Sequence, residues 1–295
     1  MFNRALFVLM SVTSPINSSQ PLFQPHIYFV PLDGALCAAD YEAGLALNWL
    51  TDDEVAKVSR YRSESARNTG LQVRLALRAI ISLHSDLKPS EWRFSYGAKG
   101  KPALSEDLLV QTGLHFNLSH SGDWLMIGIV SNKQAYAAET ALSFGVDIER
   151  ERSSTKIEAI LNHYFSAVEI EDLMALPLEL QRQRFFDLWA LKEAFIKATG
   201  KGLAQSLTSF GFTFAANSVF EAVNEQYPTI AASDYIHFSA LDYHEPQWQF
   251  YFGRLSPYYR FSVCIGDMQS QSLLHIKAPT MSIISLAQLI PSSHD

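Results

Sequence analysis

The 295-residue sequence has few features of secreted, membrane-spanning or nucleic-acid-binding proteins. Its only cysteines, Cys37 and Cys264, lie far apart and match neither a zinc site nor a redox CxxC pair, and two cysteines make no disulfide framework. No segment approaches the ~20 continuous apolar residues of a membrane-spanning helix. The formal net charge of -7 gives no overall positive field for nucleic acid or an anionic membrane. We therefore expect a soluble protein of the reducing cytoplasm, in which any anion-binding site is local.

The N-terminus resembles a weak signal peptide, because Arg4 precedes the apolar run 5–12. That run is short, and residues 13–20 lack the A-x-A-like pattern of a cleavage site. We expect a disordered leader over residues 1–20, or a start at Met10, rather than secretion.

The first half of the chain alternates between predicted helices and strands. The hydrophobic fraction of 48% can supply a sizeable core. Thr51 and Glu54 form a capping box that predicts a helix start, and residues 71–83 carry helix formers without an interrupting Gly or Pro. Strands are predicted at 26–31, 92–96, 115–118 and 124–130, the last two around a polar turn at 119–123.

The second half repeats this mixture of elements. Capping boxes at Thr155/Glu158 and Ser166/Glu169 predict two helices, and a long helix over about 181–199 is predicted to end at Gly200. Strands are predicted at 144–149, 210–214, 235–241, 248–255 and 259–265. The strand–turn–strand patterns of both halves, without a low-complexity linker, predict an α+β fold of two similar lobes that share an interface.

The boundaries follow from this pattern. We assign residues 1–20 to the leader, 21–135 to an N-terminal lobe, 136–268 to a C-terminal lobe and 269–295 to a C-terminal tail.

The strand at 144–149 carries two carboxylates, Asp147 and Glu149. Alternate side chains of a strand share a face, so these two project together while Val146 and Ile148 face the core. Paired like charges repel unless a positive group lies between them, and oxygen-only ligands suit a hard cation such as Mg2+. A solvated polar face on an edge strand is the alternative.

The helix that contains residues 185–197 is apolar on almost every side, which indicates a buried helix. Its charged residues Lys192, Glu193 and Lys197 must then be paired or bound to a ligand. A Glu193–Lys197 pair on one helix would add only about 0.2–0.5 kcal/mol, too little to justify burial. Glu193 is therefore a candidate third carboxylate beside Asp147 and Glu149, and Lys197 would point at the same anion.

Three motifs, at 116–121, 145–149 and 189–202, occur in an order and spacing that resemble the 4'-phosphopantetheinyl transferases of the Sfp type. The resemblance covers roughly residues 50–207. It implies two pseudo-symmetric lobes with coenzyme A and the active site between them. It also implies Mg2+-dependent transfer of phosphopantetheine from coenzyme A to a serine of an acyl, peptidyl or polyketide carrier protein, with release of 3',5'-ADP.

The resemblance also implies roles for individual residues. Asp147, Glu149 and Glu193 would hold Mg2+, with Glu149 acting directly or through a water, and Lys197 would steady the diphosphate. Glu193, or a water on Glu149, would take the serine proton.

Coenzyme A contacts are implied for a second group of residues. Ser119 and His120 match contacts to the nucleotide phosphates, and Lys101 matches a coenzyme-binding lysine. Lys99 could fill the same role, but Lys101, which precedes Pro102, is our choice.

The sequence allows more than one role for several other residues. Ser119 could instead stabilise a turn, and Glu169 could serve either its capping box or the active site. Six basic residues could form a solvated helix face or part of an anion-binding wall: Lys57, Arg60, Arg62, Arg67, Arg74 and Arg78.

Two other kinds of function remain to be weighed against transfer. One is a non-catalytic module of the same fold that binds coenzyme A or a carrier protein, and the other is a Mg2+-dependent phosphotransferase for a smaller nucleotide. Neighbouring Ser119 and His120 point to opposite faces of a strand, which argues against a hydrolase. Because one chain supplies both lobes, we expect a monomer that binds neither nucleic acid nor membrane.

Overall fold

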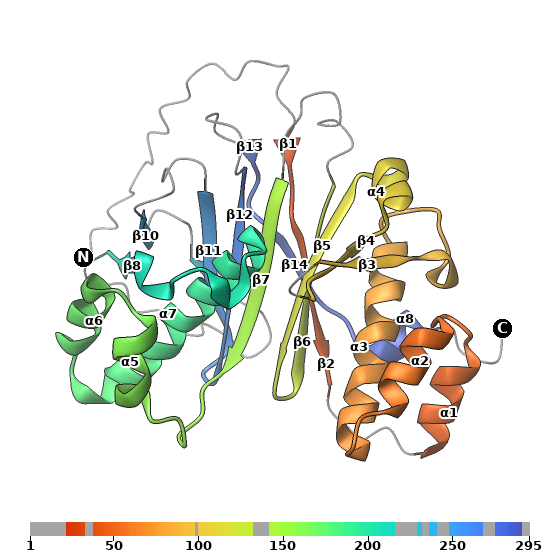
Figure 1. Cartoon of the computed structure of the whole chain (residues 1–295), viewed down its shortest axis with the longest axis horizontal. Coiled ribbons are helices and arrows are strands. Elements are labelled where there is room, and N and C mark those ends of the chain that lie inside the picture. The colour runs from red at the N-terminus through yellow and green to blue at the C-terminus, as the bar shows by residue number, and fades with distance from the viewer. Residues whose placement is uncertain are drawn as a thin grey trace, which may run out of the picture.

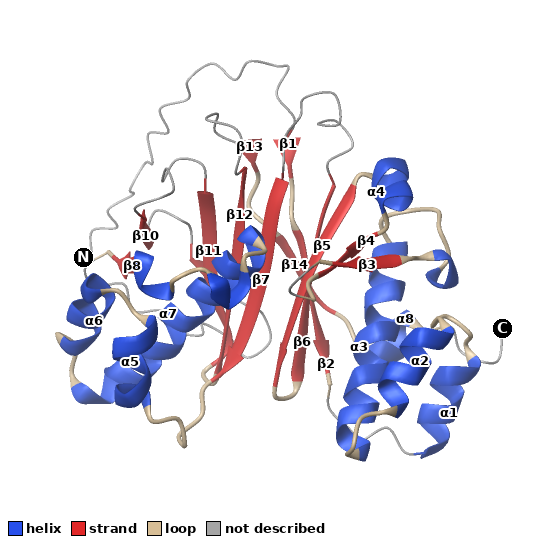
Figure 2. Cartoon of the chain, in the orientation of Figure 1, coloured by secondary structure: helices blue, strands red, loops and turns tan. Residues whose placement is uncertain are grey.

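The computed structural model describes residues 22–32, 38–97, 100–131, 142–215, 229–231, 236–240, 248–267 and 275–290. The predicted leader, Cys37 and Lys99 lie outside these residues. Two sheets stand side by side at the centre of the molecule, each with its helices on the outer side (Figures 1 and 2). This arrangement confirms the predicted α+β fold.

The first lobe is built on a sheet of four strands in the order β14-β2-β6-β5. Its strands are β2 (His26–Pro31), β5 (Leu114–Ser121), β6 (Trp124–Ser131) and β14 (Thr280–Ile283). Strands β2, β6 and β5 pair antiparallel, whereas β14 joins β2 in parallel. The lobe also contains the helices α1 (Ala38–Ala46), α2 (Asp52–Ser59), α3 (Glu64–Ser82) and α4 (Glu106–Thr112), a 3-10 turn (Pro89–Glu91), and the hairpin of β3 (Phe94–Tyr96) and β4 (Pro102–Leu104).

The second lobe is built on another four-stranded sheet, in the order β7-β12-β11-β9. Its strands are β7 (Leu142–Arg150), β9 (Thr229–Ala231), β11 (Trp248–Ser256) and β12 (Tyr259–Asp267), and β8 (Phe210–Phe214) and β10 (Ile236–Ala240) form a separate pair. Its helices are α5 (Ile157–Tyr164), α6 (Ala167–Met174) and α7 (Leu178–Thr199), with 3-10 turns at Gly202–Ala204 and Leu207–Ser209.

Two of the three predicted capping boxes and the predicted end of the long helix agree with the structure. The capping boxes at Thr51 and Ser166 are both formed. Gly200 closes α7 with a left-handed φ of 69°, a conformation that glycine adopts without strain. The predicted Thr155/Glu158 box is wrong, because Lys156 precedes α5 and provides no side-chain capping bond.

The hairpin of β5 and β6 is tighter than the sequence suggested. Strand β5 continues through Ser121, whose Cα partner in β6 is Trp124, so only Gly122 and Asp123 form the turn. Ser119 and His120 are therefore strand residues and not part of a turn. Elsewhere α3 begins at Glu64 and α7 at Leu178, earlier than predicted.

The two sheets meet along β5 and β7, and a shared apolar core fills the space beside this seam. Phe29 and Met126 from the first lobe pack with Val146, Ile148 and Phe261 from the second. Polar bonds cross the same seam, because the side-chain oxygen of Asn117 accepts from the backbone N–H of Val146 at 2.9 Å. The interface therefore fixes β5 residues against β7 residues.

The C-terminal segment returns to the first lobe. Strand β13 (His275–Ile276) pairs with β1 (Leu22–Phe23), and β14 adds an edge strand to the first sheet. Helix α8 (Leu286–Leu289) places Leu286 against the cluster of Val58, Leu71 and Leu75. Within the described part of the chain, no helix has the length and apolar character needed to cross a membrane.

Candidate active site

Asp147 lies at the centre of the seam between the lobes and is only 2% exposed. Its Oδ1 accepts a hydrogen bond from Ser119 Oγ on β5 at 2.8 Å and pairs with Lys197 Nζ on α7 at 2.7 Å. Its Oδ2 is buried and has no hydrogen-bond partner. Burial raises the pKa of Asp147, and the opposing effects of Lys197 and Ser119 favour its charged form. Oδ1 of Asp147 therefore has two polar partners, whereas Oδ2 remains available to a ligand.

Glu149 occupies the same face of β7 two residues later, as predicted. Its Oε2 accepts a hydrogen bond from Ser121 Oγ at 3.0 Å. Burial and then the charge of Asp147 raise the pKa of Glu149 to about 7, while Ser121 and Arg152 oppose the shift. The repulsion expected between two carboxylates on one strand face is thus present in the folded protein.

Glu193 approaches the same place from α7. Burial, followed by the charge of Asp147, raises its pKa, and Lys197 opposes that shift. Because Asp147 affects both Glu149 and Glu193, the three carboxylates belong to one electrostatic cluster.

Helix α7 is set close to β7 by a glycine. A Cβ on Gly145 would overlap the carbonyl oxygen of Ala194 and the backbone nitrogen of Ala198, so a residue with a side chain would push the helix away. This close approach places Glu193 and Lys197 beside Asp147.

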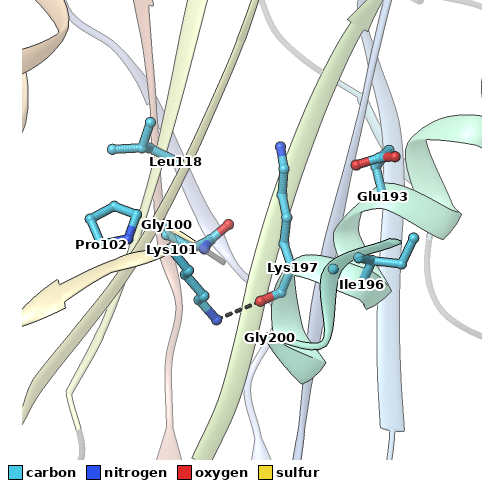
Figure 3. A pocket seen from close by; sticks show the side chains of 10 residues that line it. Gly100, Lys101, Pro102, Leu118, Glu193, Ile196, Lys197 and Gly200 are labelled. Carbon is cyan, nitrogen blue, oxygen red and sulfur yellow. Dashed lines mark hydrogen bonds between the residues drawn. The ribbon is translucent and has the colours of Figure 1, made fainter. Parts of the chain in front are cut away.

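A pocket of about 340 Å³ opens between this helix and the first lobe. Figure 3 shows Glu193, Ile196 and Lys197 on one wall, and Lys101, Pro102 and Leu118 on the other. The pocket combines an apolar lining with two lysines and one carboxylate, which suits an anionic ligand with an apolar part.

Comparison with known proteins identifies the family. The chain is 32% identical over 184 residues to the putative 4'-phosphopantetheinyl transferase slr0495 of Synechocystis sp., a match covering 62% of this chain and 68% of that protein. It is also 31% identical over 180 residues to the 4'-phosphopantetheinyl transferase HetI of Nostoc sp., covering 61% and 70% respectively. The chain belongs to the 4'-phosphopantetheinyl transferase superfamily.

Further matches agree with this assignment. The 4'-phosphopantetheinyl transferase Sfp of Bacillus subtilis is 32% identical over 185 residues, covering 62% of this chain and 74% of Sfp. The superfamily model matches residues 143–249, and a model of the 4'-phosphopantetheinyl transferase N-terminal region matches residues 38–132. The predicted resemblance to Sfp-type transferases and the assignment as a transferase enzyme are confirmed.

The site provides some of the oxygen donors that a divalent cation would need. Three carboxylates and the unpartnered Oδ2 of Asp147 provide the oxygen donors that a hard cation prefers. Within the described ranges, however, no three His, Cys, Asp or Glu side chains are grouped closely enough to hold a metal ion. Lys197 already places a positive charge against Asp147 through their ion pair.

The residues predicted to contact nucleotide phosphates lie on opposite faces of β5. Ser119 is buried and bonded to Asp147, whereas His120 is exposed. Desolvation and then the charge of Lys197 lower the pKa of His120, so this ring lies within electrostatic reach of the site. The alternative role of Ser119 in a turn is wrong, because the residue pairs with Met126 inside the sheet.

Lys101 lines the pocket, but its ammonium group is already bonded to protein. Its Nζ donates to the backbone oxygens of Lys197 at 2.5 Å and Phe144 at 3.1 Å. Burial lowers the pKa of Lys101 to about 8, Cys264 opposes that shift and Lys197 adds to it.

Two charged residues with open assignments have structural partners. Glu169 forms its capping box and pairs with Lys192 at 2.7 Å, both groups being at most 1% exposed. Lys192 also donates to the carbonyl oxygens of Leu207 and Phe210. The ion pair and hydrogen bonds within the second lobe therefore explain the burial of Lys192, which the sequence predicted to be paired or bound to a ligand.

Two residues of the basic stretch over 57–78 have different surroundings. Arg78 is 1% exposed, pairs with Glu54 and donates to the carbonyl oxygens of Pro89 and Trp92, so it stabilises the first lobe. Lys57 is exposed and lies over the ring of Tyr96.

Sequence reasoning missed the supporting residues of the site. Asn117, Ser121 and Arg152 form hydrogen bonds across the seam between the lobes. Asn117 accepts from the backbone of Val146, and Arg152 Nη2 donates to Ser121 Oγ at 3.3 Å. The alternation of Asn117, Ser119 and Ser121 along β5 is the signal that could have revealed one polar strand face.

Proposed function

We propose that this transferase moves the 4'-phosphopantetheine group from coenzyme A to a serine of an acyl, peptidyl or polyketide carrier protein, and that it depends on Mg2+. The serine oxygen forms a new bond to the phosphorus that bears pantetheine. The bond from that phosphorus to the 3',5'-ADP leaving group breaks. The serine proton passes to a base of the protein.

The observation that supports this proposal most directly is the arrangement around Asp147. A pocket between the lobes lies beside the buried carboxylate of Asp147, of which only one oxygen has hydrogen-bond partners. Next to it are the Lys197 ammonium group and two carboxyl groups with raised pKa values, those of Glu149 and Glu193. Such a site can position a diphosphate and balance its charge, which is the main task of a protein in phosphoryl transfer.

Asp147, Glu149 and Glu193 would hold Mg2+, which when bound would neutralise charge on the diphosphate oxygens. Ser119 and Ser121 fix the orientations of Asp147 and Glu149 through the hydrogen bonds described above. Lys197 contributes a positive charge at the pocket wall, and Ser119 and His120 would contact the nucleotide phosphates.

Two residues are candidates for the base that takes the serine proton. The raised pKa values of Glu193 and Glu149 bring these carboxyl groups nearer to the operating pH, where a general base is most effective. Glu193 would act directly, and Glu149 through a water.

The proposal extends to partners and location. A carrier protein of fatty acid, polyketide or peptide synthesis is the expected acceptor, in the cytoplasm, and the enzyme would act as a monomer. Such a carrier usually presents an acidic helix, which exposed basic residues of α2 and α3 would attract.

Mass spectrometry of an apo carrier protein incubated with this protein, coenzyme A and Mg2+ tests the reaction. We expect the carrier serine to gain one phosphopantetheine, and we expect a chelator to abolish the gain. No gain on acyl and peptidyl carriers, with coenzyme A bound, would instead favour a binding module.

A further inference from the structure

The ammonium group of Lys101 connects the two lobes. Lys101 lies on the loop between β3 and β4 of the first lobe, and both of its acceptors belong to the second lobe. One acceptor is the carbonyl oxygen of Lys197 in the last turn of α7, and the other is the carbonyl oxygen of Phe144 on β7. Lys101 therefore joins three elements through one cation.

The carbonyl of Lys197 needs such a donor. The last four carbonyls of a helix have no partner within the helix, and a lysine is a favourable donor at this negative end of the helix dipole. The amide of Gly200 satisfies the neighbouring carbonyl of Ile196 at 3.0 Å. Lys101 supplies the corresponding bond for Lys197 from the other lobe.

The two lysines of the pocket point in different directions. Figure 3 shows the Lys101 side chain directed at the end of α7, while the Lys197 side chain extends away from that end. Lys197 Nζ reaches Asp147 Oδ1 at 2.7 Å. The backbone of Lys197 is thus held by Lys101, and its side chain holds Asp147.

We propose that Lys101 is a positioning residue, which fixes the last turn of α7 and thereby places Lys197 against Asp147. This role deepens the proposed transfer reaction and rests on it. It differs from an anion contact, because both hydrogen bonds of the ammonium group go to backbone carbonyls of the second lobe.

The test compares Lys101→Met, which keeps the aliphatic stem and removes the donors, with Lys101→Arg, which keeps charge and donors. Lys156→Met, at an exposed lysine before α5, is the matched control. Hydrogen–deuterium exchange of the protein without coenzyme A is the first measurement. We expect peptides covering residues 194–200 to exchange at least threefold faster in Lys101→Met, with residues 185–190 unchanged and Lys156→Met like the wild type.

Kinetics supply the second measurement. We expect Lys101→Met to lower kcat about tenfold, because small displacements of positioned groups are costly, while the KM for coenzyme A changes less than about threefold. In the double variant with Lys197→Met, the loss in kcat should fall well below the product of the single losses, because Lys101 acts through Lys197. Lys101→Arg should lie nearer to the wild type in both measurements, because it keeps the charge and the donors.

An anion contact gives the opposite pattern and would overturn the proposal. Exchange without ligand would then be unchanged in Lys101→Met, and the Kd for coenzyme A, measured by calorimetry, would rise at least tenfold with little change in kcat. If the wild-type protein transfers nothing to any carrier, the proposed reaction fails, but the exchange experiment still decides whether Lys101 holds the end of α7.

Discussion

Lys197 and Asp147 form an ion pair of 2.7 Å that links the last turns of α7 to the middle of β7. The lysine is 27% exposed and the aspartate 3% exposed at its side chain, so the pair joins a buried acid to the pocket wall. Ser119 binds the same Asp147 oxygen from the first lobe. A single carboxylate oxygen therefore connects both lobes at the proposed site.

The first prediction concerns this carboxylate. Asp147→Asn keeps the shape and an acceptor for Ser119 and Lys197 but removes the negative charge. We expect the protein to fold and kcat for carrier modification to fall by roughly 100-fold or more, in the range known for the loss of one charge-stabilising group. Carrier mass spectrometry and circular dichroism measure the two effects.

The control for this substitution is Asp107→Asn on α4, where the side chain is 62% exposed. Its activity and melting temperature should match those of the wild type. Transfer at the wild-type rate by Asp147→Asn would mean that the reaction takes place elsewhere.

The sequence predicts the charged residues of the site, but it does not predict which residues form hydrogen bonds with them. A period of two places Asp147 and Glu149 on one strand face, and a buried helix demands partners for Glu193 and Lys197. Local patterns such as the Ser166 capping box and the Gly200 helix end are also readable, because their interactions lie within a few residues.

The remaining features depend on contacts between distant segments. Lys101 meets carbonyls 43 and 96 residues away, and nothing near it in sequence indicates which atoms it binds. Ser119 and Ser121 resemble turn residues, yet sheet pairing with β6 extends the strand through both. Arg78 resembles an exposed cation of a basic helix, but it is buried, and Glu54 and two backbone carbonyls bind its guanidinium group.

The second prediction concerns a buried charge network behind the site. Asp187 on α7 accepts from Arg254 at 2.9 and 2.7 Å and from Arg260 at 3.1 Å, and both arginines are at most 3% exposed. Asp187→Ala leaves two buried guanidinium groups without this carboxylate. We expect the free energy of unfolding to fall by about 3–5 kcal/mol, as measured by urea titration.

Asp172→Ala is the comparison for that experiment, because its pair with Arg184 is more exposed than the Asp187 network. Its loss of stability should be clearly smaller. Equal losses in the two variants would show that burial of the arginines does not determine the cost.

The third prediction concerns Gly145, whose missing side chain allows α7 to approach β7. In Gly145→Ala the new methyl group meets backbone atoms of Ala194 and Ala198, which cannot rotate away. We expect a loss of about 1–3 kcal/mol in stability and a fall in kcat, because Glu193 and Lys197 move with the helix. Gly97→Ala is the control. The nearest atom to its new methyl group is 3.8 Å away, so we expect the protein to tolerate this substitution.

The fourth prediction concerns pH and His115 on β5. Burial, and then the charge of Lys101, lower the pKa of His115 to about 4, from the value of about 6.5 expected in the unfolded chain. Between these values the unfolded state binds a proton that the folded state does not bind. The contribution of His115 to stability should therefore fall as the pH drops from 7 towards 4.5.

His115→Gln isolates this contribution from the other titrating groups, several of which are carboxyl groups with raised pKa values that act in the opposite direction. We expect the free energy of unfolding of the wild type to lose on the order of 1–2 kcal/mol more than that of His115→Gln between pH 7 and pH 5, because glutamine cannot take up the proton. Urea titrations of both proteins at the two pH values provide the measurement. Parallel losses in the two proteins would mean that His115 accepts a proton in the folded state as readily as in the unfolded chain, and that its burial beside Lys101 does not keep it neutral.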